Sequence, residues 1–340
     1  MIASFEKHLL EFKTPAKTSR GSYSNKEVYL LKLINDSCEA ISEASPLPDL
    51  SIDDITLMAE KLEEVCSYIN TQKRIDEIYD ALQLQNFPSI QFALEAALIQ
   101  LNHKEPNLLF PSPFTAKQLG IPINGLVWMG SSDEQLKQIE SKVEQGYTCI
   151  KLKIGALDFD EECRMLEKVR KQYSAHKITL RVDANGAFAI ADANQKLKDL
   201  SRFELHSLEQ PIKSGQHDAM QQLCAETKIP IALDEELIGI NVNEVGEKLL
   251  KYISPQFIIL KPTLLGGFKN SDTWIAHANK LNIEWWLTSA LESNIGLNAI
   301  AQYTASLNVS LPQGLGTGAL YVNNFPPTTE IKNGVLYYTS

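Results

Sequence analysis

Three carboxylate residues recur at near-equal intervals in the second half of the chain, each closing a short apolar run. Asp183 and Glu209 are 26 residues apart, and Glu209 and Asp234 are 25 residues apart. This interval suits one strand–helix unit of a (β/α) barrel, in which catalytic groups lie at the carboxyl ends of the strands. Three carboxylates gathered there would repel one another without a cation, and hard oxygen ligands suit Mg²⁺. The spacing therefore predicts a magnesium site formed by Asp183, Glu209 and Asp234.

Three lysines accompany these acids. Lys151 and Lys153 are two residues apart on a predicted strand, so their side chains point to the same face. Lys261 follows Asp234 by 27 residues and would reach the same mouth from the opposite wall. Like charges and a nearby metal lower the pKa of a lysine, which makes a neutral amine available as a general base. Two plainer interpretations remain open: the lysines only pair with the acids, or each acid caps the helix that follows it.

The elements that would position these residues are short apolar runs that alternate with amphipathic helical stretches. The runs are residues 123–129, 149–154, 178–183, 205–209, 231–234, 257–261 and 283–288, with a weak last one near Leu315. Eight such runs favour an α/β fold of the (β/α) TIM-barrel type. An open doubly wound sheet shows the same alternation and is the structural alternative.

The first part of the chain has a different pattern. Strand-like stretches at 4–12 and 26–34, separated by a turn-rich stretch at 18–22, precede predicted helices at 51–71 and 89–101. Residues 334–338 read as a strand that returns to this part. We therefore expect an α+β capping domain at 1–115, completed by residues 320–340, and a catalytic barrel at 116–319.

The composition narrows the class of partner. The chain has 340 residues, 44% of them hydrophobic, and a formal net charge of −10. This charge disfavours binding to nucleic acids and to anionic membrane surfaces. Five scattered cysteines suggest reduced, structural thiols. The start of the chain shows no signal-peptide pattern and no run approaches about 18 apolar residues, so we expect a cytoplasmic protein.

Taken together, the motifs resemble the muconate-lactonising branch of the enolase superfamily. They are Lys-Leu-Lys at 151–153, Val-Asp-Ala-Asn-Gly at 182–186, Leu-Glu-Gln-Pro at 208–211, Leu-Asp-Glu at 233–235, Leu-Lys-Pro at 260–262 with Gly266-Gly267, and Ser-Ala-Leu-Glu-Ser at 289–293. The stretches at 18–21, 120–125 and 315–318 look like those of o-succinylbenzoate synthases, in which an N-terminal loop closes over the site. The seventh strand ends without His and the last lacks Asp-x-Asp, unlike mandelate racemases and the usual dipeptide epimerases.

This resemblance implies a lyase that dehydrates 2-succinyl-6-hydroxy-2,4-cyclohexadiene-1-carboxylate to 2-succinylbenzoate in menaquinone biosynthesis. The cofactor would be Mg²⁺, with Mn²⁺ able to substitute, and the substrate carboxylate would bind the metal. Lys153 would remove the proton beside that carboxylate and return it to the departing hydroxyl, while Lys261 would act as a cation on the opposite face.

The resemblance also suggests supporting and substrate-binding residues. Lys151, Asn185 and Glu235 would support the base and the metal. The candidate substrate-binding residues are Arg20, Ser289, Glu292 and Ser293. An N-acylamino-acid racemase, with Lys153 and Lys261 as opposed bases, is the nearest alternative, and a non-catalytic binding barrel is a more distant one. The sequence leaves open whether the chain forms a homo-oligomer.

Overall fold

A computed structural model describes residues 1–18, 21–36, 38–71 and 74–340. The chain begins with an antiparallel sheet in the order β1–β2–β3. Its strands are β1 (Ile2–Thr18), β2 (Gly21–Ile34) and β3 (Glu39–Ala44). The predicted strands at 4–12 and 26–34 lie within β1 and β2. β3 has no predicted counterpart, because its sequence Glu-Ala-Ile-Ser-Glu-Ala contains few residues that favour strands.

Three helices pack against this sheet and share a hydrophobic cluster with it. They are α1 (Met58–Asn70), α2 (Ile78–Ala81) and α3 (Pro88–Gln100). α3 matches its predicted range closely, but α1 begins later than the predicted start at Ser51. The reason is that Asp53 is buried and accepts a hydrogen bond from the Ser89 backbone N at 3.1 Å, at the start of α3. Asp54 instead caps a short 3₁₀ turn at Ile55–Leu57.

The second part of the chain forms a seven-stranded sheet in which every neighbouring pair is parallel. The strands follow one another in sequence order. They are β5 (Gly125–Val127), β6 (Cys149–Lys153), β7 (Thr179–Asp183), β8 (Ser207–Glu209), β9 (Ile231–Leu233), β10 (Phe257–Leu260) and β11 (Glu284–Leu287). A doubly wound sheet would reverse its strand order at a switch point. The unbroken order excludes that alternative.

Gln313 and Gly314 occupy the eighth position of the ring. Gln313 forms a parallel bridge with Ile123, and Gly314 forms one with Thr288 just after β11. These two single bridges join both ends of the sheet and close it into a barrel, which confirms the predicted fold class. They also explain why the sequence signal for the last strand is weak, since this segment makes isolated bridges rather than a ladder.

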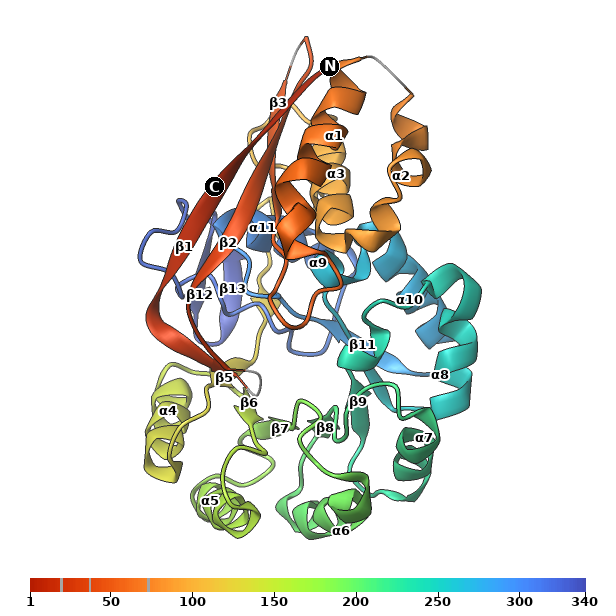
Figure 1. Ribbon diagram of the computed structural model, residues 1–340. Helices are drawn as coiled ribbons and strands as arrows, with labels where there is room; N and C mark the ends of the chain where they lie inside the picture. The colour runs from red at the N-terminus through yellow and green to blue at the C-terminus, as the bar shows by residue number, and fades with distance from the viewer. Residues whose placement is uncertain (19–20, 37, 72–73) are drawn as a thin grey trace.

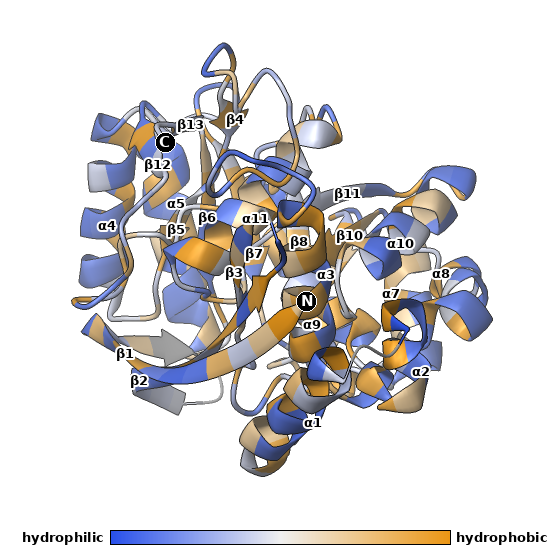
Figure 2. Cartoon of the chain, turned by 90° about the horizontal axis from the view of Figure 1, so that it is seen from above, coloured by the Kyte–Doolittle hydropathy of each residue, from blue (hydrophilic) through white to orange (hydrophobic). Residues whose placement is uncertain are grey.

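Helices surround the barrel strands and the N-terminal sheet stands over one end (Figure 1). The helices of this part are α4 (Ser132–Glu144), α5 (Phe159–Gln172), α6 (Ile190–Leu200), α7 (His217–Glu226), α8 (Glu247–Ile253), α9 (Pro262–Leu265), α10 (Phe268–Lys280) and α11 (Asn294–Ser306). Most mix hydrophilic and hydrophobic residues, as expected for helices with one face on a core (Figure 2). None of the helices in the described ranges combines the length and the apolar character that a membrane-spanning helix requires.

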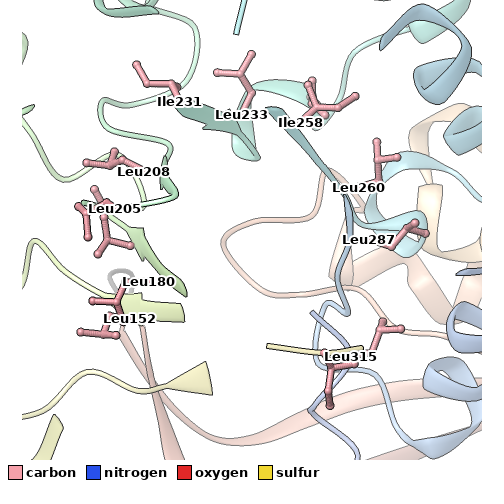
Figure 3. Packing of buried hydrophobic residues seen from close by; sticks show 14 of the residues in the cluster. Leu152, Leu180, Leu205, Leu208, Ile231, Leu233, Ile258, Leu260, Leu287 and Leu315 are labelled. Atoms are coloured by element: carbon pink, nitrogen blue, oxygen red, sulfur yellow. The ribbon is translucent and has the colours of Figure 1, made fainter. Parts of the chain in front are cut away.

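Side chains alternate between the two faces of each barrel strand. Leucine and isoleucine residues point outward around the ring, away from its centre (Figure 3). On β6 the outward Leu152 is flanked by Lys151 and Lys153, which therefore point inward. A separate apolar cluster of Ala232, Phe257, Ile259 and Trp286 fills part of the interior. The alternation thus places one set of apolar residues against the helices, while the inward side chains include both this apolar cluster and the lysines of the barrel mouth.

The C-terminal segment contacts both parts of the chain. β12 (Thr329–Lys332) and β13 (Val335–Tyr338) form a small sheet with β4 (Ile121–Pro122). Just before them, Tyr321 makes a bridge with Phe12 of β1. The domain limits at 115/116 and 319/320 stay a prediction. All five cysteines are free thiols.

Candidate active site

A cavity of about 100 Å³ lies where the N-terminal part covers the barrel mouth. Tyr23, Leu47, Pro48 and Leu50 reach it from the N-terminal part. The barrel contributes Asn124, Leu126, Trp128, Lys151, Lys153, Asn185, Glu235, Lys261, Thr288, Ser289, Ala290, Leu291, Gly314, Gly316 and Thr317. An apolar lining with a few converging charged groups is typical of a small-molecule site.

Lys153, Asp183 and Glu209 lie in one row across three strands. The register pairs Lys153 with Asp183 and Asp183 with Glu209. The Lys153 ammonium donates to Asp183 Oδ2 at 2.6 Å and to Asn185 Oδ1 at 2.7 Å. The predicted base and two predicted acids are therefore brought together by the strand pairing itself.

The other two lysines complete the cluster. Lys151 Nζ lies 2.9 Å from Asp183 Oδ2 and 2.5 Å from Glu209 Oε2. Lys261, at the end of β10, forms an ion pair with Asp234. Lys151, Lys153 and Lys261 all line the cavity. The acids are almost completely buried, so the ammonium groups compensate charges that water cannot reach.

The electrostatics of the cluster differ from the expectation of lowered lysine pKa values. Burial favours the neutral amine of Lys261, but the charges of Asp234, Glu235 and Glu209 outweigh it and raise its pKa. Acidic neighbours likewise hold the pKa of Lys151 above its usual value despite burial. Without a cation, the charges of the acids therefore outweigh burial at both lysines.

The acids of the cluster divide into two kinds. Burial tends to raise the pKa of Asp183, but Lys151 and Lys153 outweigh it and hold this pKa below its usual value. The pKa of Glu209 is raised well above its usual value, first by burial and then by the neighbouring charge of Asp183. Crowding of carboxylates is thus unfavourable in this cluster, and a further cation would relieve it.

The donor set suits a divalent cation in its chemistry. Glu209 Oε1 is buried and has no hydrogen-bond partner among the described residues. An orphaned carboxylate oxygen beside two further buried carboxylates fits a hard cation such as Mg²⁺. In the described part of the chain, however, no group of three His, Cys, Asp or Glu side chains is arranged to hold a metal ion. The lysines already occupy oxygens of these acids, so a cation would compete with them.

Two polar residues behind the cluster, Asn185 and Gln210, connect the strand ends. Asn185 accepts from Lys153 and donates to Glu235 Oε1 at 3.1 Å. Gln210, which has no role in the sequence predictions, donates to Glu236 at 3.0 Å and accepts from the Asp234 backbone N at 3.2 Å. Asn185 and Gln210 both have positive φ, 44° and 41°. Such backbone conformations are uncommon and cluster at functional sites.

The predicted substrate-binding residues differ in whether they line the cavity. Ser289 lines the cavity, and its hydroxyl lies 2.6 Å from that of Thr317. Glu292 lies outside the cavity lining and accepts from Thr263 Oγ1 at 2.5 Å. Ser293 also lies outside it and caps α11, where its backbone N donates to Glu43 at 2.9 Å. Arg20 lies outside the described residues.

The apolar roof and wall of the cavity have no counterpart among the sequence predictions. Leu47, Pro48 and Leu50 come from an irregular stretch, and Trp128 follows β5. Asn124 Oδ1 is buried without a hydrogen-bond partner among the described residues. Asn124 lies in the 120–125 stretch that resembles o-succinylbenzoate synthases. For the other residues the only sequence signal is their apolar character, which does not distinguish a cavity wall from ordinary core.

The chain is similar to known proteins in both sequence and structure. Residues 134–339 match the family model described as Enolase C-terminal domain-like. The chain is 43% identical to the o-succinylbenzoate synthase of Desulfotalea psychrophila, over 99% of this chain and 98% of that protein. It superposes on the crystal structure of MenC from Desulfotalea psychrophila LSv54 with a TM-score of 0.91 and 40% identity, over 99% of both chains.

A more distant solved structure shares the fold. The crystal structure of the o-succinylbenzoate synthase of Thermosynechococcus elongatus BP-1, complexed with Mg in the active site, matches with a TM-score of 0.76 and 22% identity over 92% of both chains. The family match covers more than half of this chain, and the 43% relative covers nearly all of it. The chain therefore belongs to the enolase superfamily and, within it, to the o-succinylbenzoate synthases.

Proposed function

We propose that the protein dehydrates 2-succinyl-6-hydroxy-2,4-cyclohexadiene-1-carboxylate to 2-succinylbenzoate, a step of menaquinone biosynthesis. The observation that carries this proposal is the cavity into which Lys153 and Lys261 both project, with buried carboxylates beside each. A carbon acid beside a carboxylate needs a base and nearby positive charge, and this cavity offers both. The close relative of that name supports the choice of substrate.

Asp183, Glu209 and Asp234 are the residues that would hold Mg²⁺, with Mn²⁺ as a substitute. Their burial, their hard oxygen donors and the orphaned Glu209 Oε1 support this assignment. The Mg in the Thermosynechococcus elongatus structure is consistent with it. When bound, the cation would supply positive charge for the substrate carboxylate and for the negative charge that develops on it.

Lys153 would carry the proton. As a neutral amine it takes the proton from the carbon beside the carboxylate, and as an ammonium it returns that proton to the departing hydroxyl, which leaves as water. One residue can do both because the elimination is syn, so the two groups leave from one face. Asp183 and Asn185 contact Lys153 Nζ and would fix its direction.

Lys261 would act from the opposite face as a fixed cation. Neighbouring carboxylates raise its pKa despite burial, which keeps it positively charged. A positive charge in a cavity shielded from water stabilises developing negative charge more strongly than it would in bulk solvent. Lys151, held between Asp183 and Glu209, would tune the charge around Lys153.

Substrate contacts come from the cavity lining. Ser289 lines the cavity, which supports its assignment to the succinyl side of the substrate. We assign no substrate contact to Glu292 or Ser293, because their side chains bind other protein groups. The roles of Arg20 and Glu235, a cytoplasmic location and a homo-oligomeric state stay predictions.

A racemase is the second candidate, because two lysines in one cavity also fit proton transfer between two faces. The test uses purified protein with Mg²⁺ and follows two reactions side by side. Loss of the ultraviolet absorbance of the cyclohexadiene substrate is expected, with racemisation of an N-succinylamino acid slower. An unchanged absorbance together with rapid racemisation would reject the dehydratase assignment. A failure of both reactions, and of Mg²⁺ binding in calorimetry, would favour a non-catalytic barrel.

A further inference from the structure

The segment that joins β11 to α11 forms one wall of the cavity. Ser289, Ala290 and Leu291 all line it. Leu291 has a φ of 62°, in the left-handed region that a branched apolar residue rarely adopts. Such a conformation is energetically unfavourable and persists only where surrounding contacts enforce it. Contacts from outside the segment must therefore stabilise its conformation.

These contacts come from two residues far away in the sequence. Lys26, on β2 of the N-terminal sheet, donates to the backbone O of Ala290 at 2.7 Å and of Leu291 at 3.0 Å. The Tyr321 hydroxyl donates to the same Leu291 O at 2.6 Å. Two consecutive carbonyls are thus bound by side chains from outside the segment. We call Lys26 and Tyr321 the 290/291 clamp.

The buried position of Lys26 is energetically unfavourable for a charged side chain. Lys26 is 2% exposed and pairs with the buried Leu10 in the register of β1 and β2. Burial lowers its pKa to about 8, although Glu292 and Glu43 raise it in part. Taking an ammonium out of water costs free energy, and the two carbonyl acceptors together with the charges of Glu292 and Glu43 offset part of this cost. The two hydrogen bonds give the buried ammonium a defined position against the cavity wall.

The N-terminal sheet also holds the next residues of the chain. Glu43 on β3 accepts from the backbone N of Ser293 and of Gly296, each at 2.9 Å, at the start of α11. Glu292 folds back to accept from the Ala290 backbone N at 2.8 Å. The cavity wall and the helix after it are thus fixed to the same sheet at consecutive points.

We propose that Lys26 and Tyr321 are positioning residues that hold the cavity wall 289–291 in its productive shape, so that the N-terminal sheet sets how tightly substrate binds. The substrate named here rests on the proposed function, but the hold on the segment does not. Neither residue touches the reacting atoms in this account. Their loss should weaken binding more than it slows the chemical step.

The test compares Lys26→Met and Tyr321→Phe with wild type. Lys32→Met is the matched control, because Lys32 lies on the same strand but forms an exposed ion pair with Glu39 at 2.8 Å. The first measurement is amide hydrogen exchange of residues 289–293 in the free protein. The second is the separate determination of KM and kcat for the dehydration, together with binding of 2-succinylbenzoate.

For Lys26→Met we expect exchange in 289–293 to be about tenfold faster or more, and KM about tenfold higher with a smaller change in kcat. Tyr321→Phe should change both in the same direction but less, and Lys26→Arg should recover part of the loss. Lys32→Met should behave as wild type. A folded Lys26→Met variant with wild-type exchange and wild-type KM would overturn the proposal.

Two further outcomes also decide. If Lys26→Met does not fold, Tyr321→Phe takes its place, and a folded Tyr321→Phe variant with unchanged exchange and unchanged KM rejects the clamp. If wild type shows no dehydration, the proposed function fails, and hydrogen exchange alone then supports or rejects the clamp. The two failures are therefore distinguishable.

Discussion

Lys153 and Asp183 lie directly opposite each other in the register of β6 and β7, and the Lys153 ammonium donates to Asp183 Oδ2 at 2.6 Å. The residue proposed to move the proton is thus oriented by a residue proposed to hold the cation. Because strand pairing places both, the base cannot shift along its strand without breaking the barrel ladder. The chemistry of the site is built into the sheet register.

Replacement of Lys153 by Met should abolish most of the activity while the fold is kept. The variant retains the length of the side chain but removes the group that takes and returns the proton. We expect kcat to fall about a thousandfold or more. Steady-state assays measure this, with exposed Lys168→Met as the control. A Lys153→Met enzyme within tenfold of wild type would assign the proton transfer elsewhere.

Replacement of Lys261 should separate the two candidate reactions. Lys261→Arg keeps a positive charge on the opposite face but cannot readily act as a base. We expect dehydration to be reduced yet measurable, and Lys261→Ala to lose far more. Racemisation should disappear in both variants, because it needs a base on each face. Equal loss of dehydration in Lys261→Arg and Lys261→Ala would contradict a role that depends only on charge.

Glu209→Gln should weaken cation binding. The change replaces a buried carboxylate whose Oε1 has no partner among the described residues by a neutral amide. We expect the Mg²⁺ affinity measured by calorimetry to fall by about tenfold or more, since charge is the main attraction for a hard cation. Glu226→Gln, on the exposed surface of α7, should leave it unchanged. Unaltered Mg²⁺ affinity in Glu209→Gln would remove this residue from the proposed ligand set.

Glu95, a buried acid of the N-terminal part, leads us to predict that the stability of the fold depends on pH. Glu95 on α3 is buried and accepts from the backbone N of Phe268 and Lys269 at the start of α10. Burial raises its pKa to about 7, although these hydrogen bonds lower it in part. The folded pKa therefore exceeds the unfolded value of 4.5, so the folded state binds this proton more tightly than the unfolded state does.

The contribution of Glu95 to folding is fully present below pH 4.5 and is lost as pH rises through 7. Relative to Glu95→Gln, wild type should lose up to about 3 kcal/mol of unfolding free energy between pH 5 and pH 8. Urea denaturation of both proteins at the two pH values measures this, with exposed Glu60→Gln as the control. A stability difference that does not vary with pH would contradict the raised pKa.

The sequence predicts the barrel and its charged strand ends well, for a physical reason. Each barrel unit is local, so an apolar run followed by Asp183, Glu209 or Asp234 marks a strand end without knowledge of distant contacts. The near-equal spacing then predicts that the three carboxylates converge, because adjacent parallel strands end at the same edge of the sheet. This is why the acids and lysines could be placed before the fold was known.

Contacts between distant segments could not be predicted in this way. Glu43 caps a helix about 250 residues further along the chain, and Lys26 binds carbonyls at a similar distance. No local pattern encodes such pairs. The motif around Ser293 predicts a substrate ligand, yet the Ser293 hydroxyl donates a hydrogen bond to Glu43. The lysine pKa values depend on the balance between burial and charge, which only the assembled cluster defines.

The most direct test of the central claim is the anomalous diffraction of crystals soaked with Mn²⁺ and 2-succinylbenzoate. The account predicts one strong peak within about 2.5 Å of a carboxylate oxygen from each of Asp183, Glu209 and Asp234, with the ligand carboxylate beside it. Lys153 and Lys261 should face the ligand from opposite sides. A peak elsewhere, or an ordered ligand without a metal among these three acids, would contradict the account.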